Sequence, residues 1–207
     1  MNQINRLNLN EMARREEELL DLEAIFALQK VVGDMVSNNK KKLAENMDKF
    51  KKHQFEYEYE YDSYHDSIQE QYELELRIQE TFNEMVIVCL YKMVEINRKN
   101  LFIKYIVKEE KINLSHINNI VDLDKEHNLK IECFNSYLDM EELRLVNNCI
   151  KHNDSIIEEK LNSKFKKYII GESIAVNESM IDRFKVSAKE YIHELARIFH
   201  KRENDRK

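Results

Sequence analysis

The sequence contains no proline and only two glycines among its 207 residues. A chain of this length with average composition would have roughly 10 prolines and about 14 glycines. Tight β-hairpins need turn residues with a positive or a fixed φ angle, which glycine and proline provide. The scarcity of both residues therefore argues against a protein built from β-hairpins. It also argues against Gly-rich loops of the kind that hold nucleotide phosphates.

Cysteines are also few and lack the spacing of a metal site. Cys89, Cys133 and Cys149 are odd in number, contain no C-x-x-C pair, and each lies beside apolar residues. We therefore expect free thiols in the protein core, not disulfides. The histidines form no H-x-x-x-H or H-E-x-x-H pair, so zinc is not expected. The sequence predicts neither a metal nor a cofactor.

Long hydrophobic runs are absent as well. The first ten residues are polar and rich in asparagine, which does not resemble a signal peptide. The longest apolar run, Met85–Tyr91, is far shorter than the roughly 20 residues that span a membrane. We therefore expect a cytoplasmic protein without a membrane partner.

The formal net charge of −6 gives no overall preference for nucleic acid. Lysines do cluster locally at 40–42, at 49–52 and at 164–167. Such clusters usually belong to solvated helix faces or loops, and we expect the same here.

The residues that are present favour long helices. Hydrophobic residues make up 43% of the chain, and charged residues make up 35%, which is typical of helices with solvated faces. Apolar residues recur at spacings of three and four, which predicts helices over residues 11–36, 40–80, 81–108, 139–153 and 178–202. We expect the first helix to end or kink near Gly33 and the polar segment 37–39. In the third, we expect a break near 97–100.

The predicted fold is all-α, an antiparallel helical bundle of about five to seven helices. Residues 1–50 are expected to form a long N-terminal helical extension, and residues 51–207 the bundle. A turn is expected around Gly171. The last helix should bury one apolar stripe, composed of Ile181, Phe184, Ala188, Ile192, Leu195 and Phe199.

An unusual run of aromatic residues lies in the second predicted helix. Residues 55–61 alternate between aromatic residues and glutamate, which is the period of a strand. Aromatic and apolar residues then continue at helical spacing, so we predict a helix with a broad aromatic face. A protein or subunit interface suits tyrosine, because its ring packs while its hydroxyl stays solvated. A platform for stacking RNA bases is the alternative. The proposed interface residues are Tyr57, Tyr61, Tyr64 and Tyr72.

A polar row marks the predicted helix over 139–153. Arg144, Asn148 and His152 are separated by four residues each and so share one face, opposite the apolar residues. Asn147 and Lys151 are expected to form a second polar row beside it. Asparagine is a poor helix former, so its repeated use here indicates that this face holds something polar.

In this segment the sequence resembles the HEPN superfamily of helical domains that cleave or bind RNA. The resemblance is carried by residues 147–153, Asn-Asn-Cys-Ile-Lys-His-Asn, and by the layout of helices over about 55–200. In active members, two such motifs meet across a homodimer and cut RNA without a metal. The resemblance implies that a histidine and an arginine activate the ribose 2′-hydroxyl and stabilise charge on the phosphate.

The match departs from the family pattern at the arginine. Asn147 stands directly before Asn148, where the family has the arginine. Arg144 lies eight residues before His152, about 12 Å along a helix axis. Lys151 points about 100° away from His152 around the helix. A missing positive charge of this kind often costs a few kcal/mol of transition-state stabilisation, so we expect weak or no ribonuclease activity.

Three functions are compatible with these observations. The first is a HEPN-like homodimer without strong catalysis that binds RNA or a protein partner, in phage defence or a toxin–antitoxin setting as the resemblance implies. The second is an active metal-independent endoribonuclease that uses His152 and Asn148 with Arg144 or Lys151. The third is a helical scaffold or assembly protein with no nucleic-acid role, in which the tyrosine-rich helix is the interface.

Overall fold

A computed structural model describes residues 11–12, 15, 22–107 and 127–205. These residues contain five α-helices and no named strand, so the all-α prediction is confirmed. Part of the predicted first helix, over 11–36, lies outside the described residues.

The chain divides into two compact units. One consists of residues 23–86 and 175–177, and we call it the hairpin unit. The other consists of residues 1–22, 87–174 and 178–207, and we call it the core unit. The division predicted from the sequence, 1–50 and 51–207, stays a prediction.

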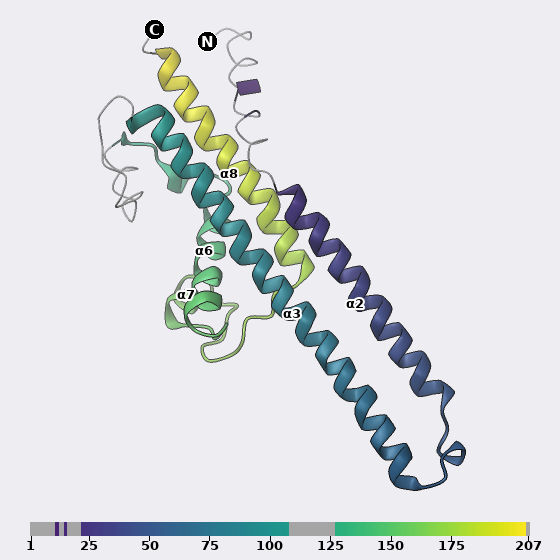
Figure 1. Ribbon diagram of the computed structural model, residues 1–207. Coiled ribbons are helices and arrows are strands. Elements are labelled where there is room, and N and C mark those ends of the chain that lie inside the picture. Colours follow the sequence, from purple (N-terminus) through teal and green to yellow (C-terminus); the bar gives the residue numbers. More distant parts are fainter. Residues whose placement is uncertain (1–10, 13–14, 16–21, 108–126, 206–207) are drawn as a thin grey trace. The chain divides into compact units, whose positions relative to one another are not determined.

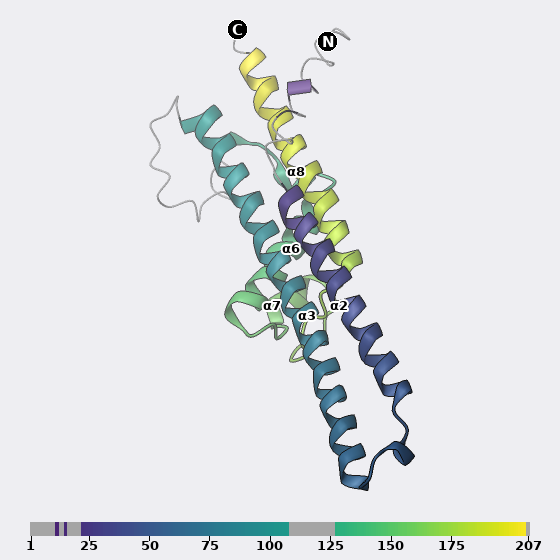
Figure 2. The ribbon, with the colours of Figure 1, turned by 45° about the vertical axis from the view of Figure 1, so that its right-hand side comes forward.

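The hairpin unit is built from two antiparallel helices (Figures 1 and 2). They are α2, Glu23–Lys49, and the first part of α3, Glu58–Phe102. Two polar contacts set their register. The Asn39 side-chain amide donates to Glu75 Oε1 at 2.8 Å, and the Tyr64 hydroxyl donates to the Asn46 carbonyl at 3.4 Å. These contacts pair residues 39–46 of α2 with residues 64–75 of α3.

The predicted helix end near residues 33–39 is wrong, because α2 continues without a break to Lys49. Glycine, serine and asparagine weaken a helix by about 1 kcal/mol each or less, whereas proline would cost about 3 kcal/mol. The chain has no proline. Packing against α3, including the bond from Asn39 to Glu75, therefore outweighs the weak local preference.

The turn lies instead at residues 50–57 and is filled by aromatic rings. Phe50 packs edge-on against Tyr64 with ring centroids 5.1 Å apart, and Phe55 packs against Tyr61 at 5.5 Å. Helix α3 then begins at Glu58, and Glu60 accepts a hydrogen bond from the Tyr57 backbone N–H at 3.2 Å. This bond satisfies a donor that the start of the helix would otherwise leave open. The alternating run 55–61 is thus part turn and part helix.

The predicted boundary at residue 80 and the break near 97–100 are also wrong. Helix α3 is continuous to Phe102, followed by a π-helical turn over Ile103–Val107. Asn97 remains in the helix, with its side-chain amide donating to the Met93 carbonyl at 2.9 Å. That bond satisfies the asparagine without interrupting the backbone ladder.

The core unit holds most of the buried apolar residues. Its helices are the end of α3, α6 (Tyr137–His152), α7 (Glu159–Lys164) and α8 (Glu178–Asp205). A short 3₁₀ helix, Ile131–Cys133, precedes α6. The stripe predicted for the last helix is confirmed, since all six of its residues are buried. Phe199 of this stripe packs edge-on against Phe102, with centroids 5.3 Å apart.

The prediction of free cysteines in the protein core is only partly confirmed. All three are free, and Cys149 is buried in α6. Cys133 is exposed, so its expected place in the core is wrong. It belongs to the short 3₁₀ helix, where the neighbouring Ile131 supplies the buried side chain.

A compact loop region follows α6 and includes α7. Asp154 and Ser155 have positive φ angles of 48° and 64°, which reverse the chain after the helix. The Ile157 N–H donates to the Glu172 carbonyl at 2.9 Å, and the Gly171 N–H donates to the Ile157 carbonyl at 3.0 Å. These bonds close the loop. The predicted turn at Gly171 is confirmed, and its φ of +85° is a conformation that glycine adopts without the strain of a side chain.

Replacing Gly171 with alanine should lower the free energy of unfolding by about 1 kcal/mol. A Cβ atom at this position would meet nothing within 4 Å, so the cost is conformational and not steric. Urea denaturation measures it, with the exposed Ser163→Ala as a comparison. A variant as stable as the wild type would contradict the assigned turn.

Candidate functional site

Helix α6 carries the residues singled out from the sequence. It spans Tyr137–His152, close to the predicted 139–153, and His152 is its last residue. His152 and Lys151 are exposed, whereas Arg144 and Asn148 are half-buried. Because the helix is continuous, Arg144, Asn148 and His152 do share a face as predicted. The histidine end of this row is therefore open to solvent, at the C-terminal end of the helix.

Arg144 is held by a carboxylate on its own helix. Its Nε donates to Glu141 Oε1 at 3.1 Å, and its Nη2 donates to Oε2 at 3.0 Å. Lys164 of α7 adds a third contact, with its Nζ 2.6 Å from Glu141 Oε2. Glu141 lies three residues before Arg144, so the guanidinium is drawn towards the start of the helix. The structure thus turns Arg144 away from His152 and neutralises its charge.

Asn147 does not lie where the sequence reading placed it. The side chain is only 2% exposed, so the second polar row with Lys151 is wrong. Positions 143, 146 and 147 share one face of a helix, and Leu143 and Val146 are fully buried on it. The Oδ1 atom of Asn147 is inaccessible to solvent and has no hydrogen-bond partner in the described part of the chain. The two adjacent asparagines therefore differ in environment, one buried and one half-exposed.

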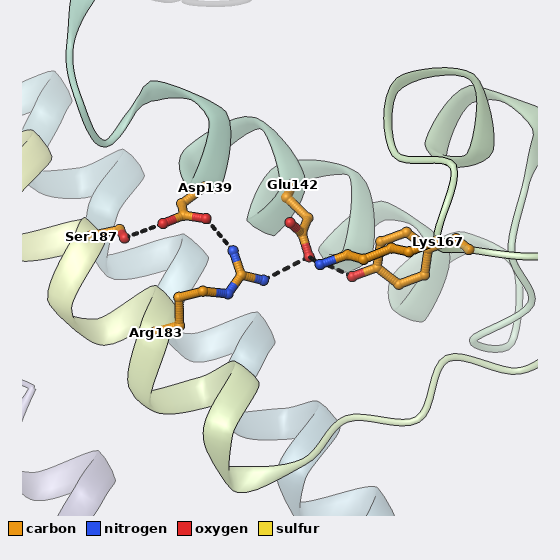
Figure 3. A network of polar contacts seen from close by, with 6 residues as sticks. Asp139, Glu142, Lys167, Arg183 and Ser187 are labelled. Atoms are coloured by element: carbon orange, nitrogen blue, oxygen red, sulfur yellow. Dashed lines mark hydrogen bonds and ion pairs between the residues drawn. The ribbon is translucent and has the colours of Figure 1, made fainter.

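A network of charged residues joins α6 to α8 (Figure 3). The Arg183 guanidinium of α8 lies between two carboxylates of α6, forming ion pairs with Asp139 and with Glu142 Oε1, the latter at 2.7 Å. Ser187, one turn further along α8, donates to Asp139 Oδ2 at 2.5 Å. Glu142 is only 3% exposed. The network therefore fixes the contact between these helices with an ion pair in which the carboxylate of Glu142 is buried and Arg183 is partly exposed.

Glu142 accepts two further contacts from the loop region after α7. Lys167 Nζ lies 2.8 Å from its Oε1 atom, and the buried Tyr168 hydroxyl donates to the same oxygen at 2.6 Å. Burial raises the pKa of Glu142, but the bonds from Lys167, Tyr168 and Arg183 outweigh it and leave the pKa below its usual value. Glu142 is thus an ionised anchor that joins two segments to α6, namely the loop after α7 and helix α8.

Glu141 has a similarly low pKa. Burial again raises it, but hydrogen bonds from Arg144 and Lys164 outweigh that effect and lower the pKa of Glu141 to about 2. Adjacent glutamates on α6 thus remain ionised for different structural reasons. One holds Arg144 and α7, and the other holds α8 and the loop between α7 and α8.

The predicted tyrosine face is divided between different environments. Tyr61 and Tyr64 pack into the aromatic turn of the hairpin. Tyr57 precedes α3, is 52% exposed and stacks on Tyr59. Tyr72 lies further along α3 beneath Lys40, whose Nζ is 5.2 Å from the ring centroid. A single continuous aromatic face is therefore wrong, because the helix starts only at Glu58.

Sequence reasoning missed the charged network of Figure 3. Asp139 and Glu142 lie among apolar residues of an amphipathic helix, and Arg183 precedes the buried Phe184. Charges inside an apolar stripe could have indicated buried pairing. The pairing partners of these residues on α8 could not be found, because they are 41 to 48 residues apart in the chain.

No family model, no curated protein and no solved structure matches this chain. Within the described ranges, no group of three or more His, Cys, Asp or Glu side chains is arranged to hold a metal. Among these same residues, no helix is long and apolar enough to cross a bilayer. The described residues form an all-helical protein. Helix α6 ends in the exposed residues Lys151 and His152.

Proposed function

We propose that this protein is a HEPN-like helical protein that binds RNA without cleaving it strongly. The binding surface is the exposed end of α6, composed of Asn148, Lys151 and His152. One observation carries the proposal: the arginine on this face is occupied by Glu141, while the lysine and histidine beside it are open to solvent.

The chemistry of this surface suits a phosphate backbone. Lys151 and His152 offer donors at a helix end, and Asn148 adds an amide one turn before. Two more exposed lysines without an ion pair in the described residues, Lys160 and Lys166, follow within the same unit. Glu158 and Glu159 lie between His152 and Lys160 in the sequence and reduce the local charge. We therefore expect affinity in the micromolar range that falls steeply with salt.

The same geometry disfavours strong catalysis. Metal-independent cleavage of RNA requires a base near the 2′-hydroxyl and a positive charge near the phosphate. His152 meets the first requirement. The only arginine on its face is paired with Glu141 and directed the other way. The scaffold function remains the alternative and predicts no RNA binding at all.

Binding to a mixed pool of fluorescent 20-mer RNAs in EDTA tests this proposal. We expect Lys151→Glu to weaken binding about tenfold, because it reverses one phosphate contact. The exposed Lys201→Glu on α8 makes the same charge change elsewhere and should leave binding nearly unchanged.

The integrity of the same RNA, followed on a gel, separates the remaining functions. Intact RNA that is bound by the wild type and released by Lys151→Glu supports the proposal. Cleavage that His152→Ala abolishes would replace it with the endoribonuclease function. Absence of binding at 50 mM salt would overturn it in favour of the scaffold.

A further inference from the structure

The hairpin unit lacks a core of its own. Among the described residues, only four buried hydrophobic side chains belong to it, namely Val36, Ile68, Val86 and Val176. Ten of the sixteen exposed large hydrophobic residues found in the described ranges lie on the same unit. Two antiparallel helices can bury only the stripe between them, so a second apolar face remains uncovered. An exposed face of this kind marks an interaction site.

The uncovered face forms a groove of about 580 Å³ along the two helices. Val32 and Met35 line it from α2. The α3 side is formed by Leu74, Ile78, Thr81 and Met85, which alternate at spacings of four and three. Leu74 is 51% exposed and Met85 is 55% exposed. This spacing is the seam of a coiled coil over about 16 Å of helix.

The charged residues beside this seam become complementary when two copies of α3 pair in antiparallel orientation. Arg77 lines the groove, is exposed, and makes no ion pair within the described part of the chain. Glu84 lies seven residues further on and so occupies the same position in the seven-residue repeat. In an antiparallel pair of α3 helices, that position on one helix faces the same position on the other. Each Arg77 would then meet a Glu84 of the second helix.

The geometry points to a second copy of this chain as the occupant of the groove. The two hairpins associate about a two-fold axis that passes between Ile78 and Thr81. Leu74 of one copy then packs beside Met85 of the other, and Ile78 beside Thr81, in a four-helix arrangement with short-range knobs-into-holes packing. The two-fold axis makes both Arg77–Glu84 pairs at once. This inference goes beyond the proposed RNA binding, since it concerns a surface on the other unit.

Analytical ultracentrifugation of the full chain from 0.5 to 100 µM tests the dimer. Leu74→Lys and Met85→Lys should each raise its dissociation constant at least about a hundredfold, because both place an ammonium in the apolar seam. Both side chains are about half exposed in the single chain, so helicity by circular dichroism should be kept. Leu138→Lys is the matched control, since Leu138 is 64% exposed on α6. It should leave the dimer intact.

Exchanging the two charges distinguishes this specific pairing from nonspecific hydrophobic association. Arg77→Glu alone should weaken the dimer about tenfold by placing like charges together, and the double variant Arg77→Glu with Glu84→Arg should restore it. Failure of the double variant to recover would overturn the antiparallel register. A monomer at every concentration would overturn the dimer and leave the groove to a different partner. RNA binding by Lys151 is measured separately, so the two proposals can fail independently.

Discussion

Replacing Arg183 with methionine is expected to lower the free energy of unfolding by about 3 kcal/mol. The guanidinium joins Asp139 and Glu142 across the contact between α8 and α6. Without it, the carboxylate of Glu142 stays buried and loses one of its three partners. A buried charge that loses its partner costs more than the ion pair itself contributes. Urea denaturation followed by circular dichroism measures the change.

A double-mutant cycle separates this network from ordinary packing. Glu142→Leu alone leaves Arg183 without one of its carboxylates and should also destabilise the protein. The double variant should lose less free energy of unfolding than the two single variants lose together, because the buried carboxylate and its cation are both removed. Arg197→Met is the matched control on the same helix, where the side chain is exposed, and should change stability by about 0.5 kcal/mol or less. Strict additivity of the two substitutions would contradict the assigned network.

We expect the protein to lose stability between pH 5 and pH 3, because Glu141 becomes protonated more readily in the unfolded than in the folded protein. Glu141 has an ordinary pKa of 4.5 when unfolded and about 2 when folded. A carboxyl group with a depressed folded pKa stabilises the protein above the unfolded value and loses this effect as the pH falls towards the folded one. We expect the free energy of unfolding to fall by about 1 to 2 kcal/mol between pH 5 and pH 3 from this group. Glu142, whose pKa is also lowered, adds in the same direction.

Substitution identifies which carboxylate is responsible. Glu141→Gln should be less stable at pH 7 and should show a shallower loss between pH 5 and pH 3. Glu190→Gln removes an exposed carboxylate of α8 and should keep the wild-type pH dependence. Parallel profiles for wild type and Glu141→Gln would show that the ion pairs with Arg144 and Lys164 do not contribute.

Several features of the fold were predictable because they depend on local preferences. The buried stripe of α8 follows from apolar residues at a helical period, as Phe184 and Leu195 illustrate. The turn at Gly171 was predictable because this glycine lies in a polar stretch between two periodic segments, and the structure gives it a positive φ. The span of α6 was also found to within two residues at its start. Each of these inferences uses residues within a few turns of each other.

Helix ends were less predictable, because weak local signals compete with packing. The asparagine-rich segment near residue 38 remains helical in α2, since the facing helix supplies a bond to Asn39. The true turn at 50–57 carries aromatic residues that also suit a helix, and it is closed by their mutual packing together with hydrogen bonds between Lys51 and Gln54. Propensities differ by less than about 1 kcal/mol per residue, so a few contacts reverse them.

By itself, the sequence determined that this protein is all-helical, where its most amphipathic helices lie, and which residues form the polar row of α6. Those properties follow from composition and period, which are local. Only the tertiary structure decided what the charged residues of that helix do. It placed Arg144 with Glu141, buried Asn147, and joined Glu142 to Arg183 and Lys167 from distant segments. The partner of each ion pair depends on which segments meet in space, and the local pattern of a single sequence does not identify it.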